Sequence, residues 1–140
     1  MKELRVLAAV ASLLLLKPLH ADEGRAVVVR PIMSATQTAS GQPISLPKVN
    51  ARVSMSEFTI APGATLPVHK HPFPRFAYVL EGTISVTDED TRQTFVYKPG
   101  DMIVEVVNQW HFGTNVGQSP VRLLVIDEVE GDLSNTILKQ

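Results

Sequence analysis

The chain contains no cysteine, and this absence excludes several kinds of site. Without cysteine there is no disulfide framework, no thiolate nucleophile and no cysteine-ligated zinc. A cluster of basic residues is also missing: 13 basic and 14 acidic side chains are spread over 140 residues, and the formal net charge is −1. Because nucleic-acid-binding surfaces need concentrated positive charge, we expect no nucleic-acid partner.

Long apolar runs are scarce as well, and the one at the N-terminus is too short to cross a bilayer. Residues 6–16 are apolar apart from Ser12, whereas a membrane-spanning helix needs about 20 apolar residues. Basic residues precede the run, and a proline and the small residue Ala21 follow it. This layout predicts a secretory signal peptide over residues 1–21. We therefore expect a periplasmic or secreted protein that does not associate with membranes after signal removal; the alternative is a retained N-terminal helix.

Residues 22–50 carry a mixed signal. Residues 25–30 read Arg-Ala-Val-Val-Val-Arg, which predicts a short strand that Pro31 ends. Residues 34–47 are rich in Ser, Thr, Gln and Gly and predict a long exposed loop. The edge of an exposed strand can pair with a second copy of the chain. We therefore expect a homodimer in which residues 25–30 supply the contact.

Residues 51–140 read as a single all-β domain. Short apolar and alternating stretches recur at intervals of about 8–12 residues, with Glu-Gly and Pro-Gly turns between them. Val53 and Met55 alternate in one phase, whereas Phe58 and Ile60 alternate in the opposite phase, which predicts a β-bulge between them. No stretch after the signal segment has a convincing helical period. This pattern predicts a β-sandwich or β-barrel.

Histidine is the residue type that points to chemistry. His69 and His71 stand two positions apart, so in an extended strand their side chains project from the same face. Neutral imidazole binds first-row transition metals, and two such ligands need one or two more from elsewhere. His20 lies in the predicted signal segment, which leaves His111 as the natural third ligand. Taken singly, each histidine could equally be a surface or core residue.

Glycines and histidines fall into two spaced groups that resemble the two motifs of the cupin superfamily. The first group comprises Gly63, His69, His71, position 75 and Gly82. The second group comprises Gly100, Asp101, His111 and Asn115, with ten residues between Gly100 and His111. The resemblance covers roughly residues 54–128.

The resemblance implies a double-stranded β-helix, the cupin jelly-roll barrel, with ligands from both motifs pointing into its mouth. It implies that His69, His71 and His111 hold one divalent transition metal, which could be Fe, Mn, Ni, Cu or Zn. It implies less about the reaction, because the superfamily includes dioxygenases, isomerases, decarboxylases, epimerases, sensors and storage proteins.

The chain departs from the family pattern at position 75, where a ligating Glu is usual and Arg75 stands instead. An ion held by three neutral imidazoles keeps its +2 charge, and a guanidinium ~5 Å away would repel it by about 6 kcal/mol at an effective dielectric near 20. Three readings follow. Arg75 points outward in an ion pair with Glu57 or Glu81, it contacts an anionic substrate in the site, or no metal binds.

Two smaller departures fall in the second motif. Val106 stands where proline is common, and Asn108 stands where glycine is common. Asn is the residue that best replaces glycine in a left-handed turn, so we expect Asn108 to preserve the turn.

Three functional hypotheses follow. The first is an exported, metal-dependent catalyst similar to cupin dioxygenases that acts on a small anionic or chelating organic molecule, with Arg75 as a candidate substrate-binding residue. The second is a non-catalytic protein that binds or senses a small anion or carbohydrate. The third is a structural cupin whose barrel only packs. Metal content separates the first hypothesis from the third, and oxygen uptake separates the first from the second.

Overall fold

The computed structural model describes residues 27–140, so the predicted signal peptide lies outside the described residues. The described part contains strands, turns and loops and no helix, and hence no helix able to cross a membrane. The strands are β1 (Ala51–Ile60), β2 (His69–Lys70), β3 (Arg75–Glu81), β4 (Ile84–Asp88), β5 (Thr94–Tyr97), β6 (Met102–Val104), β7 (His111–Asn115), β8 (Val121–Glu130) and β9 (Ile137–Leu138).

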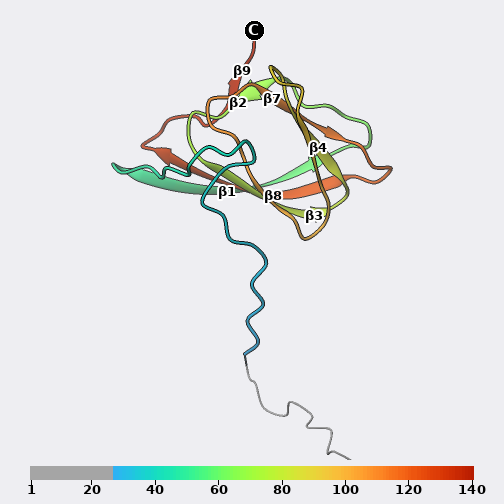
Figure 1. Ribbon diagram of the computed structural model, residues 1–140, viewed down its shortest axis with the longest axis horizontal. Helices are drawn as coiled ribbons and strands as arrows, with labels where there is room; N and C mark the ends of the chain where they lie inside the picture. Colours follow the sequence, from blue (N-terminus) through green and yellow to red (C-terminus); the bar gives the residue numbers. More distant parts are fainter. Residues whose placement is uncertain (1–26) are drawn as a thin grey trace, which may run out of the picture. The chain divides into compact units, whose positions relative to one another are not determined.

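The strands form two antiparallel sheets that face each other as a jelly roll. One sheet has the order β1-β8-β3-β6 and the other the order β5-β4-β7-β2-β9. In Figure 1, β1, β8 and β3 lie in the lower layer, and β2, β7, β9 and β4 lie above them. The all-β prediction is thereby confirmed.

Two local predictions differ from the structure. Residues 27–30, the described part of the predicted 25–30 strand, are not a strand, because no described segment pairs with their backbone groups. The predicted bulge in β1 is also wrong, since its pairing with β8 runs without a shift from Ala51 to Ile60. Val53 and Met55 lie on the outer face of β1, where they are 64% and 65% exposed. Because β1 has apolar side chains on both faces, its apolar pattern shifts from one face to the other without a bulge.

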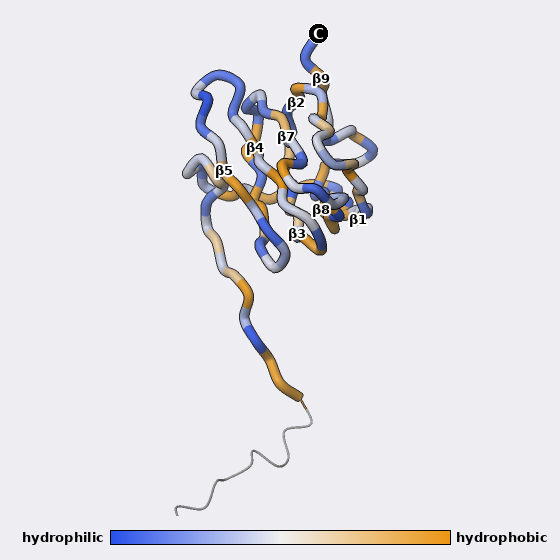
Figure 2. Tube along the Cα trace, turned by 90° about the vertical axis from the view of Figure 1, so that its right-hand side faces the viewer, coloured by the Kyte–Doolittle hydropathy of each residue, from blue (hydrophilic) through white to orange (hydrophobic). Residues whose placement is uncertain are grey.

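The hydrophobic core fills the space between the two sheets. Its buried members are Ile60, Ala77, Val79, Ile84, Val86, Ile103, Val121, Leu123 and Val125. Figure 2 shows that the turn that joins β4 to β5 is strongly hydrophilic. Three of the predicted turns also adopt the expected backbone: Gly82, Gly100 and Asn108 have φ values of 77°, 96° and 57°. The prediction for Asn108 is therefore confirmed.

Two of the motif glycines, Gly82 and Gly100, allow a direct test of the packing. A Cβ at Gly82 would lie 2.6 Å from the carbonyl oxygen of Pro120, whereas a Cβ at Gly100 would have nothing within 4 Å. Both positions have positive φ, so alanine at either should cost about 1–2 kcal/mol. Gly82→Ala should cost roughly 1–3 kcal/mol more, because the neighbouring backbone must move. Urea denaturation of the two variants measures this difference, and equal losses would contradict the packing argument.

Candidate metal centre

Three histidines meet at the end of the jelly roll where β2 and β7 pair. His69 lies directly opposite His111 in the antiparallel ladder, so their side chains share one face. His71 follows two positions after His69 and shares that face as well. The three side chains are buried, and the centroids of their rings lie 4.5–4.9 Å apart. The structure thus brings together the three residues that the motif spacing singled out.

Backbone carbonyls fix which nitrogen of each ring carries the proton. Each Nδ1 lies within hydrogen-bond distance of one main-chain oxygen: His69 with Pro67 (2.7 Å), His71 with Asn135 (2.6 Å) and His111 with Gln109 (2.9 Å). A carbonyl oxygen can only accept, so each Nδ1–H donates and each Nε2 keeps a free lone pair. Such hydrogen bonds typically orient the histidine ligands of metals. One ring nitrogen from each residue lies within 4.8 Å of the other two.

Burial keeps the three imidazoles neutral. Desolvation is the main cause that lowers the pKa of His69, His71 and His111. The pKa of His71 falls to about 2, because the nearby Arg75 guanidinium adds to the effect of burial. A metal therefore need not displace a proton from these rings at neutral pH.

Arg75 lies inside the jelly roll, so the outward-facing reading is wrong. Its side chain shares the inner face of β3 with Ala77 and Val79. The guanidinium pairs with Asp127 through two bonds, Nε to Oδ1 at 2.7 Å and Nη2 to Oδ2 at 2.9 Å. Its Nη1 lies 3.5 Å from Nε2 of His71, at the limit of a hydrogen bond.

The two carboxylates that we considered as outward partners of Arg75 are engaged elsewhere. Glu57 and Glu81 both accept hydrogen bonds from Arg122 on the exposed face of the sheet. These bonds explain why the pKa of Glu57 is lowered. Arg122 thus makes the surface ion pairs that an outward-facing Arg75 would have made.

Asp127 and Asn135 support the site, and the sequence reasoning missed both. Asn135 uses its main-chain oxygen to accept from His71 and its side-chain amide to donate to Asp127 at 2.6 Å. Asp127 had a detectable signal, because strand alternation places this charged residue on the inner face with Val125. Asn135 lies in an irregular segment, and no periodic pattern identifies it.

Glu105 is a further residue that the sequence reasoning missed. It directly follows β6, its side chain is 13% exposed, and its Oε2 lies 3.6 Å from Nε2 of His111. Neither of these atoms has a hydrogen-bond partner. Burial raises the pKa of Glu105, although the charge of Arg75 opposes the shift. A lone charged residue in the apolar stretch 102–107 was the available signal.

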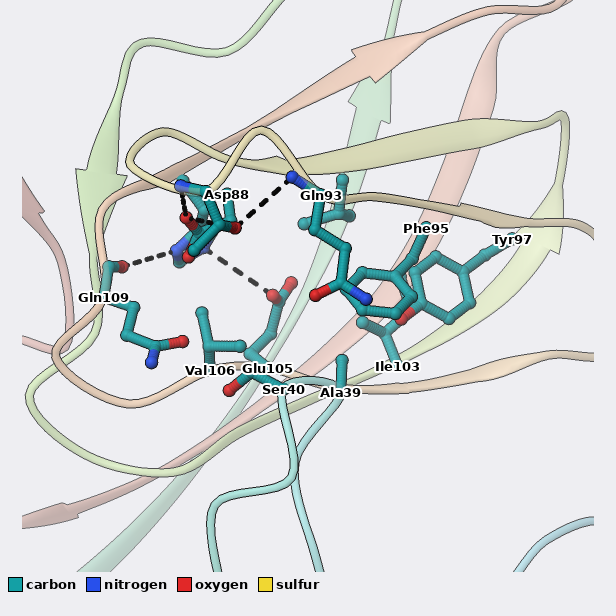
Figure 3. A pocket seen from close by; sticks show the side chains of 13 residues that line it. Ala39, Ser40, Asp88, Gln93, Phe95, Tyr97, Ile103, Glu105, Val106 and Gln109 are labelled. Atoms are coloured by element: carbon teal, nitrogen blue, oxygen red, sulfur yellow. Dashed lines mark hydrogen bonds and ion pairs between the residues drawn. The ribbon is translucent and has the colours of Figure 1, made fainter.

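Three cavities adjoin the histidines, one of which, of about 180 Å³, is lined by His69 alone of the three. A small one of about 40 Å³ is bordered by His69, His111, Arg75 and Glu105 together with core residues. A larger pocket of about 190 Å³ lies against His111 and Glu105 and extends to Phe95 and Tyr97. Figure 3 shows Glu105 and Gln109 among the side chains that line this pocket. The small cavity has room for an ion, and the larger one for a compact organic molecule, since about 150 Å³ holds a benzene ring.

The chain belongs to the cupin family. Residues 56–127 match the family model described as "Cupin domain", which covers slightly more than half of the chain. The matched region contains the three histidines, Arg75 and Glu105. No curated protein matches the chain.

Solved structures of similar proteins share the fold. The chain is 25% identical to the polyketide cyclase RemF from Streptomyces resistomycificus, with 64% of this chain and 63% of that chain covered and a TM-score of 0.53. It is 26% identical to a mutant of Bacillus subtilis oxalate decarboxylase (61% and 23% covered, TM-score 0.51). Oxalate decarboxylase from Lactobacillus farciminis is 23% identical (61% and 26% covered, TM-score 0.52). The chain thus spans less than two thirds of the length of each.

The buried neutral histidines should make the metal-free protein sensitive to acid. An unfolded histidine binds a proton near pH 6.5, whereas folded His71 does so only at about pH 2. The unfolded state therefore gains protons first, and the free energy of unfolding should fall as the pH drops below 6.5, by up to about 1.4 kcal/mol per pH unit from His71 alone. Urea denaturation in chelator at pH 7.5 and 5.5 should show this loss. His71→Gln should show a smaller dependence on pH, and an unchanged dependence would contradict the assignment.

Proposed function

We propose that the protein binds one first-row transition-metal ion through Nε2 of His69, His71 and His111. The observation that carries the proposal is the shared orientation of the three rings, in which every Nδ1–H donates to a carbonyl and every Nε2 is left unprotonated. The Nε2 of His71 also lies 3.5 Å from Nη1 of Arg75, at the limit of a hydrogen bond. Donor chemistry fits as well, since neutral imidazole suits Fe, Ni, Cu and Zn. Bacillus subtilis oxalate decarboxylase, a similar cupin, has Mn(II) centres, which supports the same class of ion here.

We propose further that the site acts on a small anionic or chelating organic molecule, with a small carboxylate as the first class to test. When bound, the metal supplies a Lewis acid that polarises an oxygen of such a molecule. Arg75 keeps Nη1 free of Asp127 and so offers a charged donor at the border of the small cavity. Gln109 leaves its Oε1 unpaired beside the larger pocket and can accept a hydrogen bond from a ligand. Similarity to oxalate decarboxylase supports this class of substrate.

A non-catalytic binding protein for a small anion or carbohydrate is the second candidate. The same pocket and the same unpaired acceptors would serve such a role. Turnover separates the two candidates, because only a catalyst such as a dioxygenase or decarboxylase consumes the bound molecule.

We also propose that the protein is exported and forms a homodimer. Export is supported by the signal-like residues 1–21. Dimerisation is supported by β1, an edge strand whose outer residues Val53 and Met55 are largely exposed. This surface replaces residues 27–30 as the proposed contact, since those residues are not a strand.

Metal content provides the first test of the proposed function. The purified protein should contain close to one transition-metal ion per chain by elemental analysis. His69→Ala, His71→Ala and His111→Ala should each lose most of the ion, because two imidazoles remain and a neutral methyl replaces the third. Glu81→Gln serves as the control that should keep the metal, because Glu81 pairs with Arg122 on the exposed face of the sheet. Equal metal in all four variants and the wild type would overturn the proposal.

Binding of oxalate provides the second test. Calorimetry should detect oxalate binding to the metal-loaded protein and not to the metal-free protein, since the ion supplies most of the attraction. Arg75→Gln should weaken this binding by roughly tenfold or more, the worth of one charge-assisted hydrogen bond. Oxygen uptake and carbon dioxide release in the same mixtures distinguish a catalyst from a binding protein. Equal binding with and without metal would contradict the proposed site.

A further inference from the structure

We propose that Glu105 is a fourth ligand of the metal and supplies the carboxylate that position 75 lacks. This inference rests on the proposed metal binding. It concerns a residue outside the positions that supply ligands in the family motifs, and it follows from how β3 and β6 pair.

The register of the two strands places Glu105 beside Arg75. Phe76 pairs with Val104 in the antiparallel ladder, and the next step brings Arg75 opposite Glu105. The main chain confirms this step, since the N–H of Glu105 donates to the carbonyl oxygen of Arg75 at 3.0 Å. Directly opposed residues project their side chains from the same face of a sheet. A carboxylate at position 105 therefore reaches the space that a carboxylate at position 75 would reach from the neighbouring strand.

Two unpaired acceptors face each other at this point. Nε2 of His111 carries a lone pair because its Nδ1–H donates to the carbonyl of Gln109. Oε2 of Glu105 lies 3.6 Å away, and both atoms are buried without a partner. A proton shared between them would require a shorter distance to make a hydrogen bond. A cation between them satisfies both lone pairs at once.

The separation also suits two ligands of one ion. Nitrogen and oxygen ligands lie about 2.0–2.2 Å from a metal such as zinc, so neighbouring ligands at 90–109° are about 3.0–3.5 Å apart. The observed 3.6 Å is close to this range. One cavity of about 40 Å³ is bordered by Glu105, His69, His111 and Arg75. The carboxylate and two of the imidazoles therefore line the same small space.

The charges of the site give an independent argument. Asp127 cancels the charge of Arg75 through the two-bonded ion pair. Glu105 has no ion pair with any lysine or arginine among residues 27–140, so a negative charge on its carboxylate would be left uncompensated. A buried, unpaired carboxylate is costly unless a cation joins it. With a divalent ion present, the set of three imidazoles and one carboxylate has the net +1 charge of the usual cupin site.

Cobalt(II) tests the proposal, because its visible absorption reports on its ligands. The wild type, Glu105→Gln and Glu105→Asp would be titrated with Co²⁺ to measure affinity, and their visible spectra compared at saturation. Glu105→Gln removes the charge and keeps the volume, and it should weaken Co²⁺ binding at least tenfold and change the spectrum. Glu105→Asp keeps the charge but withdraws the oxygens by one methylene. Glu105→Asp should also weaken Co²⁺ binding and change the spectrum. If Glu105 acted only through its charge, Glu105→Asp would keep the wild-type affinity and spectrum.

Glu81→Gln is the matched control, since Glu81 pairs with Arg122 on the exposed face and should leave Co²⁺ binding unchanged. If Glu105→Gln keeps the wild-type affinity and spectrum while His111→Ala loses the metal, Glu105 is not a ligand. The proposed three-histidine site would then remain intact. Weaker binding of Glu105→Gln with an unchanged spectrum would place Glu105 outside the coordination sphere and would likewise overturn its role as a ligand. Failure of the wild type to bind Co²⁺ would overturn both proposals.

Discussion

The ion pair between Arg75 and Asp127 is the interaction on which the interior of this protein depends. It joins the inner faces of β3 and β8, next to three buried imidazoles and a buried carboxylate. Removing one member of a buried pair typically costs about 3–5 kcal/mol, because the other charge is left without compensation. Here an unpaired guanidinium would also oppose any cation at the histidines. Two-point pairing with Asp127 is therefore what makes Arg75 compatible with a metal centre.

Much of the fold could be predicted because it depends on local patterns. The turns at Gly82, Gly100 and Asn108 follow from residue type, and the strands follow from alternation in short segments. The three histidines could be assigned to one site because their spacing resembles two family motifs. Alternation failed in β1, where Val53 and Met55 place apolar side chains on the outer face. A single sequence cannot distinguish such a face from a core face by hydrophobicity alone.

The remaining parts of the site depend on pairing between distant strands. Asp127 is 52 residues from Arg75, and only the register of β3 with β8 sets them opposite each other. Glu105 lies near position 75 only because β6 pairs with β3. Periodicity can place a charged residue on the inner face of its own strand, but it cannot say which residue that side chain will meet. Charge balance in the interior is therefore a property of the register.

Asn135 links the geometry of the site to its charge balance. Its carbonyl oxygen fixes the ring of His71 with Nε2 turned toward the other histidines, while its amide holds the Asp127 carboxylate that neutralises Arg75. Neighbouring Thr136 accepts a further hydrogen bond from Arg75 at 3.2 Å. The irregular segment before β9 thus orients one of the three histidine rings proposed to bind the metal and stabilises the buried pair beside it. Because Asn135 makes both contacts, displacement of this segment would disturb the orientation of the His71 ring and the neutralisation of Arg75 by Asp127 together.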